Sequence, residues 1–162
     1  MAGDVFDRLV ALLTDANARF RIIEHAAEGR SEAISAIRGN RPEQAAKAMV
    51  LDVRGGGGGK RHVLAILPGN RKLDFDAVAT LFEARKCGFA APGTAQELTG
   101  CMMGAVPPFA LNPALSIVVE DDLLANDTLF FNAGRLDRSM ELDTGDWLAV
   151  ARPRIARIAA RG

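Results

Sequence analysis

The sequence has few cysteines and histidines, and their positions form no metal-binding or disulfide pattern. Cys87 and Cys101 are the only two cysteines, they lack CxxC spacing, and neither histidine lies in ligand register with them. Zinc sites and disulfide frameworks are recognised by such spacing. We therefore expect a protein without a disulfide, a metal ion or another cofactor.

An excess of charge of one sign is also missing, because 20 Lys and Arg residues balance 20 Asp and Glu residues. Proteins that hold a long nucleic-acid duplex usually carry a basic excess, which argues against DNA and against extended duplex contacts. The charge balance is compatible with a small contact at the end of a nucleic acid. No apolar run approaches membrane-spanning length, and the first residues are acidic where a signal peptide is basic. We expect a cytoplasmic protein that does not contact a membrane.

What is present is the composition of an ordinary globular chain, with 49% hydrophobic and 25% charged residues. A chain of 162 residues is most simply one domain, which we place over residues 1–162. Hydrophobic periodicity and capping residues predict helices that begin after Asp4 and Asp74, at Ser31 and Thr94, and after a cap at either Asp143 or Thr144. They predict strands over 20–23, 46–54, 61–67, 115–119, 128–132 and 138–142.

Three of the predicted helices depend on particular end signals. Ser31 is the expected N-cap of a helix that buries Ile34 and Ile37. The helix after Asp74 should end at Gly88, and the capping-box pattern of residues 94–97 should begin a helix that ends at Gly100.

Five consecutive glycines, residues 55–59, and Lys60 join two β-rich segments. The run suggests a phosphate-binding loop, but Arg54 stands where that motif needs its first glycine and Arg61 where it needs Ser or Thr. The pattern therefore predicts the tip of a β-hairpin rather than a nucleotide site.

The most unusual stretch is the apolar loop over residues 100–109, which we call the glycine loop. Gly100 and Gly104 permit backbone conformations that other residues avoid, and Pro107 and Pro108 fix its end. Such a loop can direct several N–H groups at one point. The alternative is a buried connection between a helix and a strand.

Several side chains are candidates for chemistry, each with a structural alternative. Lys47 interrupts an apolar strand and either extends to solvent or reaches an anion such as phosphate. Cys101 is either a nucleophile or an apolar wall residue, and His25 either lines a cleft or is structural. Asn132, Asp137 and Arg138 are candidate pocket groups, although Gly134 with Asp137 is also typical of an ordinary hairpin turn.

No Ser-His-Asp set, metal cluster or close carboxylate pair is evident. An enzyme with this sequence would therefore work mainly by positioning its substrate and by backbone hydrogen bonds.

Together these features resemble the YbaK family of proteins, which is related to the editing domain of bacterial prolyl-tRNA synthetases. The resemblance rests on Lys47 within residues 44–50, the hairpin, the 67–74 turn, the glycine loop and the Asn132-Ala-Gly134 strand end, in that order along nearly the whole chain. It implies a compact mixed α/β (α+β) fold, with a mixed β-sheet core and flanking helices, and an aminoacyl-tRNA deacylase.

The resemblance also implies roles for individual residues. Lys47 would hold the phosphate or ribose of the terminal adenosine, and N–H groups from Gly100 through Cys101 to Gly104 would stabilise the oxyanion. Water would attack the ester, with help from the tRNA's own ribose hydroxyl. The residues that would contact the substrate are Met102, Met103, Pro107, Asn132, Gly134 and Asp137.

The sequence departs from the commonest family pattern at Cys101-Met102-Met103 and after His25, where Arg30 and Ser31 have no assigned role. The leading hypothesis is a trans-editing hydrolase acting on the acceptor end of tRNA mischarged with Ala, Ser, Thr or Cys, with a synthetase as an additional partner. The alternatives are a non-catalytic module that binds aminoacyl-adenosine or a synthetase, and a thiol enzyme using Cys101.

Overall fold

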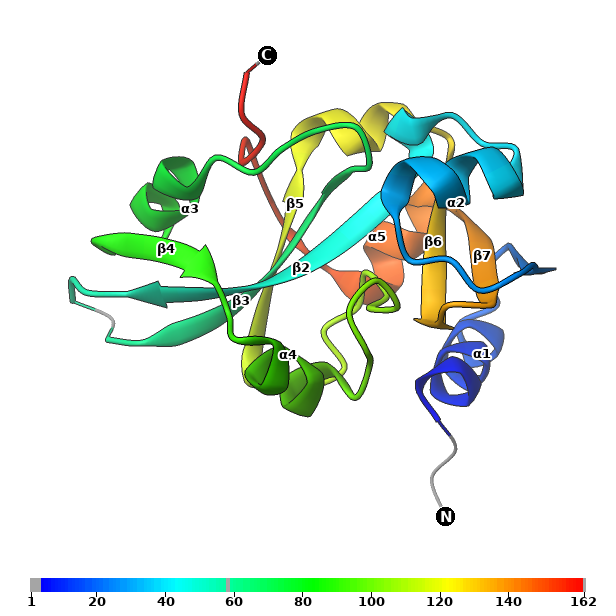
Figure 1. The fold of residues 1–162 in the computed structure, drawn as a ribbon, viewed down its shortest axis with the longest axis horizontal. Coiled ribbons are helices and arrows are strands. Elements are labelled where there is room, and N and C mark those ends of the chain that lie inside the picture. The colour runs from blue at the N-terminus through cyan, green and yellow to red at the C-terminus, as the bar shows by residue number, and fades with distance from the viewer. Residues whose placement is uncertain (1–3, 58, 162) are drawn as a thin grey trace.

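The computed structural model describes residues 4–57 and 59–161, so the expected domain over residues 1–162 includes a few positions outside the described residues, among them Gly58 in the hairpin tip. The strands form two sheets (Figure 1). The smaller sheet has the order β1-β7-β6 and the larger β4-β2-β3-β5-β8. The strands are β1 (Phe20–Glu24), β2 (Ala46–Arg54), β3 (Arg61–Pro68), β4 (Lys86–Phe89), β5 (Leu115–Glu120), β6 (Thr128–Arg135), β7 (Arg138–Asp143) and β8 (Arg154–Ala156).

The expected mixed α+β fold is confirmed, with its strands divided between two sheets rather than gathered in one. The larger sheet is mixed, because β3 pairs with β5 and β5 with β8 in parallel, whereas β2 is antiparallel to both of its neighbours. The predicted hairpin is confirmed: β2 and β3 pair in register from Ala46↔Pro68 to Val53↔Arg61.

Helices cover both sheets: α1 (Val5–Asp15), α2 (Ser31–Arg38), α3 (Phe75–Leu81), α4 (Pro92–Thr99) and α5 (Thr144–Ala151), with short 3-10 turns η1 (Pro42–Gln44) and η2 (Asp121–Ala125). Three aspartates act as the predicted caps. Asp4, Asp74 and Asp143 each accept a hydrogen bond from the backbone N–H three residues further on, at 2.9 to 3.0 Å. In Figure 1, α1 lies beside the smaller sheet and α3 beside β4.

Three helix boundaries differ from the sequence prediction. Ser31 is the first helical residue rather than the N-cap, because the Arg30 carbonyl already accepts from the Ile34 N–H. The helix α4 begins at Pro92, a favoured first helical residue, so Thr94 lies inside it and caps nothing. The helix α3 ends at Leu81, and Gly88 lies in β4, a strand that the sequence did not predict.

The face of α2 was also predicted only in part. Ile34 is buried, but Ile37 is 48% exposed. The helix is turned so that Ile34 and Arg38, which are four residues apart and share a face, line a cavity. Ile37 consequently lies on the solvent side.

The two sheets meet where β2 begins. Ala45 forms an isolated parallel bridge with Phe130 of β6. Lys47 lies two residues after Ala45, and Asn132 lies two residues after Phe130. This bridge therefore brings two candidate residues from different sheets close together. The main hydrophobic core includes residues of both sheets, such as Leu64 of β3 and Phe131 of β6.

Candidate active site

A cavity of about 640 Å³ opens between the start of β2, the end of α2, the β4–α4 segment and the glycine loop. Lys47 and the loop residues Cys101, Met102, Met103 and Gly104 all line it, together with Asn132 of β6. The two sequence features that carried the prediction therefore share one cavity. The rest of the lining is mainly apolar, for example Ile34, Val50 and Phe131.

The glycine loop is fixed at both of its ends. Gly100 ends α4 in the left-handed conformation, with φ 71°, and its N–H donates to Gln96 O at 2.7 Å. At the other end, the Trp147 indole N–H donates to Pro108 O at 2.9 Å. The loop is therefore tied by hydrogen bonds to α4 at one end and to α5 at the other.

The hydrogen bonds of the loop decide which N–H groups remain for a ligand. Gly100 N–H is used within α4, Cys101 N–H donates to Thr99 Oγ1 at 3.1 Å, and Ala105 N–H donates to Met102 O at 3.0 Å. Within the described residues, the N–H groups of Met102, Met103 and Gly104 have no acceptor. The donors left for a substrate oxygen are thus those of residues 102–104, a narrower set than the expected 100–104.

Gly104 packs directly against the segment that follows β1. Its φ is +88°, and a Cβ atom there would lie 2.9 Å from Gly29 Cα and 3.0 Å from Gly29 O. Glycine is therefore required for both conformation and space. The Asn132 amide joins the two segments, because its Nδ2 donates to Gly104 O at 2.8 Å and to Glu28 O at 3.0 Å.

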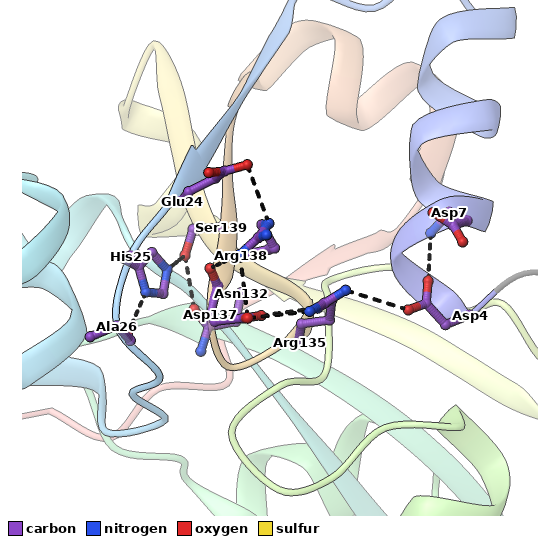
Figure 2. A network of polar contacts seen from close by, with 10 residues as sticks. All are labelled: Asp4, Asp7, Glu24, His25, Ala26, Asn132, Arg135, Asp137, Arg138 and Ser139. Carbon is purple, nitrogen blue, oxygen red and sulfur yellow. Dashed lines mark hydrogen bonds and ion pairs between the residues drawn. The ribbon is translucent and has the colours of Figure 1, made fainter.

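Four of the predicted site residues lie outside the cavity lining: Gly100, Pro107, Gly134 and Asp137. Gly134 lies at an irregularity in the β6–β7 register and donates from its N–H to Ala105 O at 2.9 Å, so it holds the loop from behind. Pro107 belongs to the loop and is buried. Figure 2 shows the Asp137 carboxylate engaged by Arg135, at 2.9 Å, and by Arg138, at 3.3 Å.

Lys47 is half-buried, and the hydrogen-bond acceptors of its ammonium group are uncharged oxygens. Its Nζ donates to the backbone carbonyls of Gly69 and Arg71, and it has no carboxylate partner among the described residues. Burial and the nearby charge of Lys72 lower the Lys47 pKa from its ordinary value. A lysine held in this way offers a point charge to an anion.

The residues between the loop glycines differ in exposure. Met102 and Met103 are 55% and 78% exposed at the cavity rim. Cys101 is buried, and its Sγ lies 3.5 Å from Thr99 O. Burial raises the pKa of the Cys101 thiol to about 11, which disfavours the thiolate that a nucleophile requires.

A buried polar network supports the cavity from behind (Figure 2). Ser139 of β7 donates from Oγ to Asn132 Oδ1 at 2.9 Å, and the same Oγ lies 2.7 Å from His25 Nε2. His25 Nδ1 contacts Ala26 O at 2.8 Å, and His25 does not line the cavity. His25 therefore acts structurally, by holding Ser139, which in turn holds Asn132.

Sequence reasoning missed Arg38, which lines the cavity from the last turn of α2. Its guanidinium donates to Asn40 Oδ1 at 3.0 Å and to Ser139 Oγ at 3.2 Å, and among the described residues it has no ion pair. Burial lowers its pKa to about 10. A basic residue in the last helical turn is common in any protein, so the sequence carried no signal for this role.

The described residues show neither a metal-binding cluster nor a membrane-spanning helix. They contain no group of three or more His, Cys, Asp or Glu side chains arranged to hold a metal ion. None of the helices in that part of the chain is long and apolar enough to cross a membrane.

Comparisons with known proteins give consistent matches. The family model of the aminoacyl-tRNA editing domain matches residues 25–150. The chain is 42% identical over 149 residues to the Multifunctional Ser/Thr-tRNA deacylase ProXp-y of Escherichia coli K12, covering 91% of this chain and 89% of the relative. The protein of that name from Escherichia coli O157:H7 matches equally.

Solved structures share the fold. A protein proposed to be a trans-editing enzyme for prolyl tRNA synthetase superposes with a TM-score of 0.81 at 21% identity, covering 99% of this chain and 100% of that one. A hypothetical protein superposes with a TM-score of 0.83 at 19% identity, covering 94% and 99%. At such identities the likeness concerns the fold alone.

Proposed function

The chain belongs to the aminoacyl-tRNA editing domain family, and from this premise we propose that it is a hydrolase that removes a small amino acid from mischarged tRNA. The observation that carries the proposal is one cavity lined both by Lys47 and by loop residues whose N–H groups have no acceptor within the described residues. An aminoacyl-adenosine needs a cation for its phosphate and N–H donors for its ester carbonyl, and this cavity supplies both.

In the proposed reaction, Lys47 binds the phosphate or ribose of the terminal adenosine and so places the ester against the glycine loop. A water oxygen attacks the ester carbonyl carbon. The negative charge that develops on the carbonyl oxygen is stabilised by the N–H groups of residues 102–104. The bond between that carbon and the ribose oxygen then breaks, and the ribose oxygen takes up the proton that the attacking water releases while the free amino acid leaves.

No side chain of the cavity is a convincing general base, because its charged residues Lys47 and Arg38 are cationic. The substrate's own ribose hydroxyl is therefore the group we expect to position the water. In this proposal Asn132 and Gly134 hold the glycine loop in place. Pro107 and Asp137 do not line the cavity and therefore do not contact the substrate.

Serine and threonine are the first amino acids to test, because the relative of 42% identity carries Ser/Thr in its name. The exposed Met102 and Met103 at the rim are flexible and can adapt to a small side chain. A synthetase is the partner class that accompanies this function, since the mischarged ester is formed there. We also propose that the chain acts as a single freestanding domain in the cytoplasm.

The test is a deacylation panel. tRNAs charged with Ala, Ser, Thr, Cys or Pro are incubated with the protein, and the remaining ester is counted over time, with and without the matching synthetase. We expect faster loss of at least one small aminoacyl ester. Saturable binding without any turnover would favour the alternative of a non-catalytic module.

A further inference from the structure

A second cavity, of about 350 Å³, lies next to the first. Ser31 and Lys47 line both cavities, so the two share a wall. The second cavity is formed by the start of α2 and by the turn that follows β3. The Lys47 ammonium is bonded to the carbonyls of Gly69 and Arg71 in that turn, and therefore lies at the junction of the two cavities.

The charges around this second cavity are not balanced. Of its basic residues, Arg71 is paired with Asp122 at 2.7 Å and Arg30 with Glu28 at 3.0 Å. Lys47 and Lys72 have no ion pair within the described part of the chain.

The acidic residue in the lining is Glu32, so the unpaired groups leave a positive excess in a chain whose formal net charge is zero. Lys47 and Lys72 are close enough that the charge of one lowers the pKa of the other. Two nearby ammonium groups without a paired carboxylate repel each other, and an anion that contacts both would relieve this repulsion.

The turn that carries Lys72 is held in place by the C-terminal segment. Lys72 O accepts from Ala160 N–H at 2.7 Å, and Arg71 donates from its guanidinium to Ala160 O at 3.1 Å. The neighbouring Leu73 forms a bridge with Ala159. The backbone that carries Lys72 is therefore already fixed before a ligand binds, which reduces the entropy lost on binding.

We propose that this second cavity binds the phosphodiester of the nucleotides that precede the terminal adenosine of tRNA, with Lys72 as its principal cation. The inference rests on the proposed function, which puts the terminal adenosine in the main cavity. Because an RNA strand is continuous, the phosphate next to the terminal adenosine has to lie close to the main cavity, and the second cavity adjoins the main one at Ser31 and Lys47. A phosphodiester carries a permanent negative charge, and lysine neutralises it as a point charge.

The test measures RNA binding separately from ester hydrolysis. Fluorescence anisotropy gives the Kd of a labelled single-stranded RNA with the sequence of the tRNA 3′ end, at several salt concentrations, for wild type, Lys72→Gln, Lys72→Arg and Lys86→Gln. Lys86 is an exposed lysine of β4 that lines neither cavity, so its variant controls for the loss of one charge.

We expect Lys72→Gln to weaken RNA binding about threefold to tenfold, and to reduce the slope of log K against log salt by about 0.7, the value for one phosphate on a single strand. Lys72→Arg should retain binding and Lys86→Gln should match wild type. If Lys72→Gln binds the RNA as tightly as Lys86→Gln does, with the same salt slope, the inference is wrong.

A second substrate separates this inference from the proposed function: adenosine 5′-monophosphate that carries serine as an ester on a ribose hydroxyl. This compound has no preceding nucleotide. A loss for Lys72→Gln that is as large on this ester as on seryl-tRNA would place Lys72 at the reacting end and overturn the inference. A wild-type protein that hydrolyses neither ester contradicts the proposed function, while the RNA titration still decides the second cavity.

Discussion

Replacing Asn132 tests how the cavity wall is held together. The side chain is 7% exposed and makes three hydrogen bonds: its Nδ2 donates to Gly104 O at 2.8 Å and Glu28 O at 3.0 Å, and its Oδ1 accepts from Ser139 Oγ at 2.9 Å. In Asn132→Ala, Gly104 O, Glu28 O and Ser139 Oγ each lose their hydrogen bond to the Asn132 amide. Ser139 retains His25, but the two carbonyls have no other side-chain donor among the described residues.

The expected cost follows from these contacts. An unsatisfied buried polar group costs about 1–3 kcal/mol. Two carbonyls next to a cavity, where water partly replaces the amide, should together cost roughly 2–4 kcal/mol of the free energy of unfolding. Activity should fall as well, by about 10- to 100-fold in kcat/KM, since Gly104 carries one of the proposed oxyanion donors.

Asn132→Asp is the matched variant, because it keeps the size and replaces the amide by a carboxylate facing two carbonyl oxygens. The pKa of the introduced carboxyl group should therefore be higher in the native state than in the unfolded state. The native state then binds a proton more readily than the unfolded state, so this variant should be less stable than Asn132→Ala at pH 7 and should gain stability as the pH falls toward 4. Urea unfolding at both pH values measures this. Wild-type stability and wild-type kcat/KM in Asn132→Ala would refute the reasoning.

Three further predictions concern single contacts. Gly104→Ala should lose more stability than Gly39→Ala, because both glycines have positive φ but only the Cβ at Gly104 meets Gly29; equal midpoints in urea would contradict the contact. Cys101→Ala should keep kcat within about threefold of wild type, because a thiol with a pKa of about 11 supplies no nucleophile at pH 7; loss of turnover in ester assays would revive the thiol mechanism. The Arg30 side chain and two backbone N–H groups hold the pKa of Glu28 at about 2, so the contribution of Glu28 to stability is present above pH 4.5 and is lost as the pH falls toward 2. In Arg30→Ala an NMR titration should find a Glu28 pKa above the wild-type value but below 4.5, because the N–H groups of residues 29 and 30 still donate to the carboxylate; an unchanged value would disprove the pairing.

The parts of the fold predicted correctly are those that local sequence determines. The caps at Asp4, Asp74 and Asp143, the hairpin and the end of α4 at Gly100 each depend on a few adjacent residues. The strand β4 was missed because it is short, three of its four residues are polar or small, and it is stabilised by pairing with β2.

The same distinction applies to the site. Lys47 and the glycine loop stand out in the sequence because a lysine in an apolar strand and paired glycines and prolines are locally unusual. Arg38 does not stand out, because its role depends on Ser139, a residue 101 positions away that also bonds Asn132. Likewise, the choice of residues 102–104 over 100–101 as free donors depends on where Gln96 O and Thr99 Oγ1 lie.

The central claim is that Lys47 and the glycine loop act on one aminoacyl ester. The most direct test is the kcat/KM of Lys47→Ala for seryl-tRNA and threonyl-tRNA, with Lys86→Ala as the matched control at an exposed lysine. Loss of one charge-assisted hydrogen bond, about 1.5–3 kcal/mol, should lower kcat/KM roughly 10- to 150-fold, and Lys86→Ala should behave as wild type. Equal rates for Lys47→Ala and Lys86→Ala would contradict the claim.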